Sequence, residues 1–512
     1  MTFSLFLQPP SPPGMDVSRD YAGGFGTAAP SSRKDYGHWP WTVPHVNLMY
    51  SAGLLVERGY DIAYVDAQAE RMNLRTTVEE VCGHKPRMIV SVVNLPSLKG
   101  DGNLLRELRS RCPDAKVVSI GTICRVLPEE VASMGFSDIV VIDEPEGVIP
   151  NLADSIQNED ELERVKGIGI VRGGQLVRTE PATEAIDLKS LPWPPYDLMP
   201  TKYYCDASFG ANANCLPVWA SRGCPMPCSF YCPHSLAVGK KIRLRPSEDF
   251  VNEIEYLNHK FGISSFILRD QLFSTHPKKV EEICDLIVSK KLRIQWLCEQ
   301  RFDAVDEKLL RRMKKAGCKR LHLGLETGDP ELLFRVGKPG TEVAKVKEAV
   351  KIIKRTGITP MTHLIVGLPG ETNQTLQNTL NLIREVGITR LNVNIATPYP
   401  GTPLYEYARD NGLIEMADWS DLTSFRSVMR TEELSTADLE EWKKYISERF
   451  LGDTFPQRMM YLMRSRGIID YLRHNLSFVF ERPSLLLKLF ESYLQTHDVE
   501  EARRMLVENT TQ

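Results

Sequence analysis

Three cysteines lie close together in the segment SRGCPMPCSFYCPHS. They are Cys224, Cys228 and Cys232, and three residues separate each from the next. The prolines among them prevent a regular helix, so we expect a wrapping loop. Three thiolates on one tight loop can bind three irons of a [4Fe-4S] cluster. The fourth iron would then be open to a substrate or cofactor.

The same loop could instead bind zinc. Structural zinc sites are usually closed by four ligands, and His234 or Cys215 would then be the fourth. Zinc ribbons normally use two separated ligand pairs, which this loop does not provide. The spacing therefore favours an iron–sulfur cluster. A closed four-ligand site would favour a non-catalytic iron–sulfur or zinc module.

The chain contains 11 cysteines, an odd number that is not typical of a disulfide framework. Cys205 and Cys215 lie upstream of the loop and are possible replacement ligands. The other cysteines are expected to pack in the interior: Cys82, Cys112, Cys124, Cys284, Cys298 and Cys318. The first residues, MTFSLFLQPPSPPG, make a poor signal peptide because they lack a basic start and soon reach prolines. We therefore expect a cytoplasmic location.

The composition is that of an ordinary globular protein, with 42% hydrophobic and 25% charged residues among 512. The 63 Lys and Arg against 66 Asp and Glu give a net charge of −3, which argues against binding to nucleic acid. No run of apolar residues is long enough to predict a transmembrane segment. The length predicts about three domains.

Strand-like and helical segments alternate in the first part of the chain. This pattern predicts an α/β fold, with a doubly wound, Rossmann-like parallel sheet over residues 1–180. Ligands of such sheets lie beyond the carboxyl ends of the strands. A proline-rich linker is predicted over residues 181–212. The strand-like runs are Ser4 to Gln8, Asp61 to Asp66, Met88 to Asn94, Val117 to Gly121 and Asp138 to Ile142.

Six further strand-like runs, separated by helical patterns, predict a partial (βα)6 barrel of the TIM type over residues 213–415. Four of the helices end at a glycine that can adopt the left-handed cap. The cysteine loop follows the first of these strands, at the face where such barrels carry their chemistry. Residues 416–512 are predicted to be helical.

These segments resemble the radical S-adenosylmethionine (SAM) superfamily, in particular its branch with an N-terminal cobalamin-binding domain. The resemblance covers roughly residues 1–415. The spacing departs from the usual pattern of three residues and then two, because SFY contains one more. We expect the loop to bulge there and still offer three thiolates. The matching segments are SRGCP, FILRDQLFS, LCEQRFD, HLGLETGDPE, THLIVGLPGET and NIATPYPGTPLY.

The resemblance implies that the three cysteines hold the cluster and that SAM binds its open iron. Acidic residues at three strand ends, Asp270, Glu299 and Glu326, are then candidates to hold SAM. Arg301 could meet its carboxylate as a forked donor. Ion pairs at strand ends are the alternative for each. The other candidates are Tyr231 beside the cluster, Gly367 for close approach to the adenine, and Tyr399 as a catalytic residue facing the substrate. A turn would equally explain Gly367, and packing would explain Tyr399.

Cobalamin is implied by the N-terminal part and its loops VNLPS, GTIC and DEPEG. The Asp-x-His-x-x-Gly segment that supplies a lower histidine ligand in many cobalamin proteins is missing. This fits either cobalamin bound without histidine or a domain that has lost the cofactor. The candidate contacts are Ser91, Asn94, Ser97 and Thr122.

The resemblance implies a cobalamin-dependent C-methyltransferase that acts on an unactivated carbon of a small-molecule or lipid-like substrate. The alternative enzyme is a radical carbon–carbon coupling or cyclisation enzyme, as in lipid or tetrapyrrole biosynthesis. The expected partner is an electron donor, either a reductase or a flavodoxin or ferredoxin.

Overall fold

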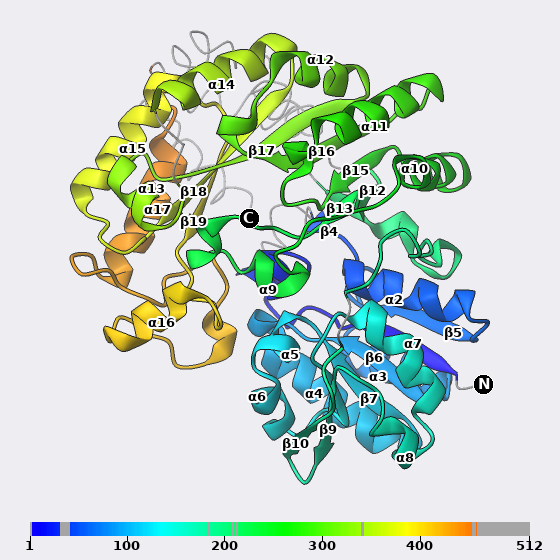
Figure 1. Cartoon of the computed structure of the whole chain (residues 1–512). Coiled ribbons are helices and arrows are strands. Elements are labelled where there is room, and N and C mark those ends of the chain that lie inside the picture. Colours follow the sequence, from blue (N-terminus) through cyan, green and yellow to red (C-terminus); the bar gives the residue numbers. More distant parts are fainter. Residues whose placement is uncertain are drawn as a thin grey trace, which may run out of the picture.

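The computed structural model describes residues 3–30, 41–182, 185–206, 209, 213–338, 343–452 and 457. Two mainly parallel sheets, each with its own helices, dominate this part of the chain (Figure 1). The first lies in the N-terminal part and the second in the central part of the sequence.

The N-terminal sheet has seven strands in the order β10-β9-β8-β7-β6-β1-β5. Its parallel strands are buried on both faces, and neighbouring residues contribute to opposite cores: Phe6 packs with Leu48 of one helix, and Leu5 packs with Leu105 of another. The predicted doubly wound, Rossmann-like fold is confirmed. The parallel strands are β1 (Ser4–Gln8), β5 (Ile62–Asp66), β6 (Met88–Val92), β7 (Lys116–Ile120) and β8 (Ile139–Val141); β9 (Ile168–Arg172) and β10 (Gln175–Arg178) form an antiparallel hairpin. The helices include α2 (Val46–Glu57), α3 (Leu74–Gly83), α4 (Leu98–Arg111), α5 (Thr122–Val126), α6 (Pro128–Ser133), α7 (Pro145–Ser155) and α8 (Glu159–Leu162).

The central sheet has six parallel strands in chain order, as a partial (βα)6 barrel requires. Within the described ranges, no pairing joins its first strand to its last, so the barrel is open there. The strands are β12 (Cys215–Val218), β15 (Ser265–Leu268), β16 (Gln295–Gln300), β17 (Cys318–Glu326), β18 (Thr359–Val366) and β19 (Leu391–Ile395). The helices on its outside are α10 (Ser247–Phe261), α11 (Pro277–Ser289), α12 (Glu307–Lys315), α14 (Val343–Thr356) and α15 (Asn373–Val386).

Side chains alternate strictly along β17. Leu321 and Leu323 are fully buried in the core shared with the outer helices, whereas His322 between them is only half-buried. The period of two places alternate residues on opposite faces, so His322 points into the barrel lumen. The same alternation along β18 places His363 on the lumen side.

Three further helices follow in the C-terminal half of the described part of the chain. They are α13 (Pro330–Arg335), α16 (Pro403–Asp410) and α17 (Thr436–Arg449), and α17 packs on β18 and β19. The predicted C-terminal helical region is therefore seen as far as α17. Most of the remainder, including the mostly apolar run from Leu485 to Phe490 that Lys488 interrupts, lies outside the described residues. No helix in the described part of the chain is long and apolar enough to cross a membrane.

Buried ion pairs join the N-terminal part to the barrel. Glu146 of α7 accepts a hydrogen bond of 2.6 Å from Arg222, and both side chains are at most 1% exposed. The Arg222 guanidinium also lies 3.6 Å from the ring centre of Trp219. Arg222 is two residues before Cys224, so this contact fixes the start of the cysteine loop against the N-terminal part.

Replacing Glu146 by alanine should lower the free energy of unfolding by about 3–5 kcal/mol, because it leaves the buried Arg222 charge without its partner. Denaturant unfolding measures this loss. The control is Glu129→Ala, which breaks the exposed pair with Arg178 and should cost less than about 1 kcal/mol. Equal losses in the two variants would contradict a special role for the buried pair.

One expectation about the cysteines was wrong. Cys82 at the end of α3 and Cys112 after α4 form a disulfide, with their Cα atoms 6.0 Å apart, instead of packing as free thiols. They lie 30 positions apart in the chain. They meet because the two helices pack side by side on one face of the sheet.

Candidate functional site

The cysteine loop begins directly after β12, at the carboxyl end of the barrel. It runs from β13 (Ser221–Arg222) through the 3-10 helix η5 (Pro227–Phe230) to α9 (His234–Val238) and β14 (Arg243–Leu244). The antiparallel pairing of β13 with β14 closes the loop at its base. The Cys224 amide donates to the Gly239 carbonyl at 3.0 Å, which holds the first cysteine against the returning chain.

The unusual spacing of the cysteines has a simple structural basis. The Cys232 amide donates to the Cys228 carbonyl at 3.0 Å, so the extra residue completes one helical turn. Side chains four residues apart lie on the same face of such a turn. Cys228 and Cys232 are accordingly close enough for their thiols to hydrogen-bond. The predicted bulge is therefore a turn that keeps the two thiols together.

The thiols differ in their ease of ionisation. The hydrogen bond from Cys232 lowers the pKa of Cys228 to about 7. The same bond and burial hold the pKa of Cys232 well above its ordinary value, and burial raises that of Cys224. Thiolates are the form that binds iron, so the donor set suits a cluster. Within the described ranges, no three His, Cys, Asp or Glu side chains converge as ligands of a single metal ion. This holds for Cys224, Cys228 and Cys232 as well.

Glu326 and Tyr231 meet beside the cysteines. The Tyr231 hydroxyl donates to the Glu326 carboxylate, which also forms a buried ion pair with Lys338. Glu326 has a backbone φ of +67°, a left-handed conformation that costs energy in a residue with a side chain. The contacts with Tyr231 and Lys338 hold this strained strand end next to the cluster loop. Both residues stay candidates for cofactor binding.

Glu299, unlike Glu326, has a carboxylate that no other side chain binds within the described residues. Its side chain is half-buried at the end of β16 and makes no hydrogen bond or ion pair within the described part of the chain. Its charge raises the pKa values of His234 and His363, partly offsetting the lowering by burial, so it lies near both rings. Of the three predicted acidic residues, Glu299 therefore has the carboxylate most available to a ligand.

The two remaining polar candidates are occupied within the protein. Asp270 accepts from the Ala220 amide at 3.0 Å and from the Ser221 hydroxyl, and burial raises its pKa to about 6. Arg301 donates in fork fashion to Asp303 at 2.8 and 2.7 Å. Asp270 therefore shapes the entry to the cysteine loop. Direct contacts of Asp270 and Arg301 with SAM stay predictions.

Gly367 forms a turn with φ of +95° at the end of β18. A Cβ at this position would lie 3.0 Å from Leu439 of α17, and its amide donates to the buried carboxylate of Glu371. The packing of α17 thus accounts for the glycine, and approach to the adenine stays a prediction. The other oxygen of Glu371 is buried without a partner within the described residues. Burial raises the pKa of this carboxyl to about 8.

The raised pKa of Glu371 predicts a pH dependence of stability. Between its ordinary value of 4.5 and about 8, the folded chain keeps a proton that the unfolded chain has released. Stability should therefore fall as the pH rises through this window, by an amount on the order of a few kcal/mol. Thermal unfolding of Glu371→Gln should show a flatter decline between pH 5 and pH 9, about the range set by these values. An unchanged slope would contradict the assignment.

Tyr399 lies against the N-terminal part instead of facing open space. It is 5% exposed, its ring stacks on Phe25 at a centroid distance of 5.2 Å, and its hydroxyl hydrogen-bonds Ser424. This geometry supports the packing interpretation. A catalytic role for Tyr399 stays an untested prediction.

Sequence reasoning identified Glu299 but missed the other members of the row of polar side chains that it belongs to. Glu299, His322, His363 and Asn392 come from β16, β17, β18 and β19, and the strand registers place Glu299 beside His322 and His363 beside Asn392. Each residue is unremarkable in its own strand. Only the pairing of the strands brings them together, so no local signal in the sequence could have identified the row.

The hydrogen bonds of this row have a direction. The Asn392 amide donates to His363 Nδ1 at 3.2 Å, so neutral His363 carries its proton on Nε2 and donates to His322 Nδ1, also at 3.2 Å. Burial lowers the pKa values of both imidazoles, which keeps them neutral. His322 therefore carries its proton on Nε2. That atom is buried and has no hydrogen-bond partner within the described residues.

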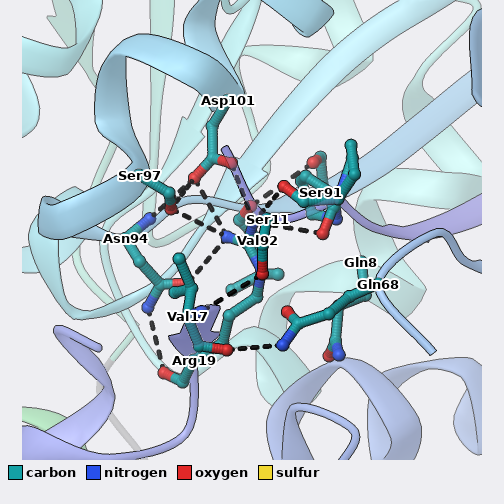
Figure 2. Close-up of polar contacts among 12 residues, drawn as sticks. Gln8, Ser11, Val17, Arg19, Gln68, Ser91, Val92, Asn94, Ser97 and Asp101 are labelled. Carbon is teal, nitrogen blue, oxygen red and sulfur yellow. Dashed lines mark hydrogen bonds and ion pairs between the residues drawn. The ribbon is translucent and has the colours of Figure 1, made fainter. Parts of the chain in front are cut away.

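The four predicted cobalamin contacts do not present free polar atoms. Asn94 and Ser97 bond to a buried arginine, Arg19, which also pairs with Asp101 at 2.9 Å (Figure 2). The Asn94 amide donates to the Arg19 and Gly24 carbonyls at 3.0 and 2.9 Å. These contacts hold residues 9–26 across the carboxyl edge of the N-terminal sheet.

The side chains of Thr122 and Ser91, the other two predicted cobalamin contacts, are also hydrogen-bonded within the protein. Thr122 donates to the Gly23 carbonyl at 2.5 Å, and Ser91 donates to the neighbouring Val92 carbonyl at 3.4 Å. All four side chains are at most 4% exposed. The four side chains are hydrogen-bonded within the protein, and their direct contact with cobalamin stays a prediction. Their role is to position the glycine-rich turn at Gly23 to Gly26.

Comparison with known proteins identifies related chains. Residues 220–383 match the radical SAM superfamily. An uncharacterized methyltransferase of Pyrococcus horikoshii is 29% identical over 412 residues, which cover 79% of this chain and 88% of the relative. An anaerobic magnesium-protoporphyrin IX monomethyl ester cyclase of Cereibacter sphaeroides is 28% identical over 79% of this chain and 65% of the relative.

Two solved structures share the fold. The cobalamin-dependent SAM radical enzyme OxsB, with aqua-cobalamin and SAM bound, matches 99% of this chain and 75% of its own with a TM-score of 0.70 and 16% identity. The radical SAM methyltransferase TsrM of Kitasatospora setae, with cobalamin and a [4Fe-4S] cluster bound, matches 81% of this chain and 76% of its own with a TM-score of 0.64 and 17% identity. At these identities the likeness concerns the fold, and it extends over both sheets.

Proposed function

We propose that this chain, whose residues 220–383 match the radical SAM superfamily, is a cobalamin-dependent methyltransferase that acts on an unactivated carbon of a small molecule. The observation that carries the proposal is the cysteine loop at the carboxyl end of the barrel, where the Cys228 and Cys232 thiols lie within hydrogen-bonding distance of each other. When bound, the cluster supplies the electron that cleaves SAM, and cobalamin supplies a carrier for the methyl group. The methyltransferase named among the relatives and the fold shared with TsrM support this choice.

The residues of the chain have separate tasks in this proposal. Cys224, Cys228 and Cys232 hold the cluster. The free carboxylate of Glu299 accepts hydrogen bonds from the ribose hydroxyls or the amino group of SAM. The free N–H of His322 orients the substrate in the lumen by donating to one of its acceptor atoms.

Product analysis with methyl-labelled SAM tests the proposal. The reduced, cluster-loaded protein should release 5′-deoxyadenosine and S-adenosylhomocysteine, and the label should appear in a product of a substrate chosen from the genomic neighbours. His322→Leu should still cleave SAM but transfer less label, because the substrate is no longer oriented. Release of 5′-deoxyadenosine without S-adenosylhomocysteine or labelled product would contradict methyl transfer.

A second candidate function is a radical cyclisation or carbon–carbon coupling without methyl transfer. The specific observation in its favour is the carboxyl edge of the N-terminal sheet, where residues 9–26 occupy the predicted cobalamin contacts. The relative named as a magnesium-protoporphyrin IX monomethyl ester cyclase also supports a cyclisation. Corrinoid measured in protein purified from cobalamin-supplied cells separates the two functions. Bound corrinoid favours the methyltransferase, and its absence favours the cyclisation.

Oxygen-sensitive clusters persist in reducing surroundings, so the proposed location is the cytoplasm. The proposed partners are a small-molecule or lipid-like substrate and a one-electron donor. The electron donor is the one partner that every radical SAM reaction of this kind requires.

A further inference from the structure

We propose that Gly23, in the N-terminal part of the chain, is a positioning residue that tunes the reduction potential of the proposed cluster. Its lack of a side chain leaves room for the His234 amide, and that amide donates a hydrogen bond to the sulfur of Cys232. Hydrogen bonds to the sulfurs are one of the ways in which a protein sets the potential of an iron–sulfur cluster. This role rests on the proposed function, because it assumes a cluster on the loop.

The turn that contains Gly23 lies against the end of the cysteine loop. Gly23 is buried with φ of +62°, and the 3-10 helix η1 (Ala22–Gly24) packs on α9. A Cβ on Gly23 would lie 2.8 Å from the Pro233 carbonyl carbon and 2.9 Å from the His234 nitrogen. Both are backbone atoms, which cannot rotate away as the end of a flexible side chain could. An alanine at position 23 would therefore push the backbone at His234.

The amide that would be displaced has a specific partner. His234 follows Cys232 by two residues, and its N–H donates to the Cys232 sulfur. The first cysteine has a similar donor, because the Met226 amide bonds to the Cys224 sulfur. The Met226 amide belongs to the cysteine loop itself. The room for the His234 amide, in contrast, depends on a residue from the N-terminal part.

Contacts on two sides hold the turn in place. Asp20, at its start, forms an ion pair of 2.8 Å with Arg269 after β15, and both side chains are at most 9% exposed. From the edge of the N-terminal sheet, Thr122 donates to the Gly23 carbonyl at 2.5 Å. The turn therefore has little freedom to move away from the cysteine loop, and the backbone at His234 has to absorb the clash.

The hydrogen bond from the amide acts on the charge of the cluster. When the oxidised cluster gains one electron from an added reductant, its sulfurs become more negative, and no bond of the chain forms or breaks. An N–H donor stabilises the reduced form more than the oxidised form, because hydrogen bonds to a more negative acceptor are stronger. Displacement of the His234 amide should therefore make the reduction potential more negative.

A redox titration of the full-length, cluster-loaded protein tests the proposal. Electron paramagnetic resonance measures the amount of reduced cluster at each applied potential, in the absence of SAM and corrinoid. In Gly23→Ala, the ratio of reduced to oxidised cluster at a fixed potential should fall about tenfold, because a hydrogen bond to a charged acceptor is weakened. For a one-electron couple this ratio corresponds to a shift of about 59 mV to more negative values.

Gly173→Ala is the matched control for backbone strain. Gly173 has φ of +59° in the hairpin of β9 and β10, and a Cβ there would meet no atom within 4 Å. Both variants should lower the temperature of thermal unfolding, because alanine rarely adopts this left-handed conformation. Only Gly23→Ala should shift the reduction potential.

A second pair of variants tests the amide directly. His234→Pro removes the N–H, and His234→Ala removes the imidazole but keeps the N–H. His234 is the first residue of α9, a position at which proline is well tolerated. The potential of His234→Pro should be more negative than that of His234→Ala. This pair decides the matter if Gly23→Ala assembles no cluster.

Equal potentials in Gly23→Ala and the wild type would overturn the proposal, and so would equal potentials in His234→Pro and His234→Ala. A shift in Gly173→Ala as large as that in Gly23→Ala would also overturn it, because strain alone would then explain the effect. Failure of the proposed function would appear differently, as wild-type protein that takes up no cluster or cleaves no SAM with dithionite.

Discussion

Replacing Cys228 by alanine is expected to abolish both cluster assembly and SAM cleavage. The residue supplies the thiol with the lowered pKa, about 7, and its backbone carbonyl accepts the bond that positions Cys232. Loss of one of three ligands leaves an iron without protein support. Iron and sulfide content after anaerobic reconstitution measures assembly, and release of 5′-deoxyadenosine under dithionite measures cleavage.

The matched control is Cys215→Ala. Cys215 is buried on β12 with Val43, Ile267 and Leu297, and it points away from the loop into an apolar cluster. We expect this variant to keep its cluster at a modest cost in stability from the lost packing. Loss of the cluster in Cys215→Ala with retention in Cys228→Ala would contradict the ligand assignment and indicate that Cys215 replaces a loop cysteine.

Replacing Glu299 by glutamine should weaken SAM binding by about 30-fold, because a hydrogen bond to a charged acceptor contributes about 2 kcal/mol. Glu299 is the predicted strand-end carboxylate without a partner within the described residues, so its full charge is available to the ligand. Equilibrium binding of SAM to the cluster-loaded protein measures the change.

Glu57→Gln is the control for this substitution. Glu57 is exposed at the end of α2, on the N-terminal part, and should not affect SAM binding. Unchanged affinity in Glu299→Gln, or an equal loss in Glu57→Gln, would contradict the role of Glu299. If Glu326→Gln rather than Glu299→Gln lowered the affinity for SAM, the contact with SAM would be assigned to Glu326 at the strained strand end.

The parts of the molecule that sequence reasoning predicted depend on local patterns. Each parallel strand of the N-terminal sheet is a short, almost wholly apolar run, and each neighbouring helix has its own periodicity and end signal. The cysteine loop was equally visible, because its chemistry lies within nine residues from Cys224 to Cys232.

The parts that could not be predicted depend on contacts between distant segments. Arg19 and Asp101 are 82 residues apart in the chain and form a buried ion pair. Arg19 also donates hydrogen bonds to Asn94 and Ser97, which had been predicted to contact cobalamin. A polar residue at a strand end is available to a ligand only if no distant residue binds it first. Glu299 and Asp270 both ended predicted strands, yet only Asp270 has its carboxylate bound within the protein.

The conformation of the cysteine loop could be predicted only in part from the sequence. The sequence showed that one residue was extra, and a loop rich in proline could have absorbed it in several ways. The bond from the Cys232 amide to the Cys228 carbonyl shows that a helical turn absorbs it. That outcome depends on the local backbone, but it could not be distinguished from other bulges without the surrounding structure.

Anaerobic reconstitution followed by reaction with SAM tests the central claim most directly. If the loop is a radical SAM centre, the wild-type protein will bind about four irons with sulfide, and under dithionite it will convert SAM to 5′-deoxyadenosine and methionine. Protein that instead contains stoichiometric zinc, takes up no iron and leaves SAM intact would contradict the claim.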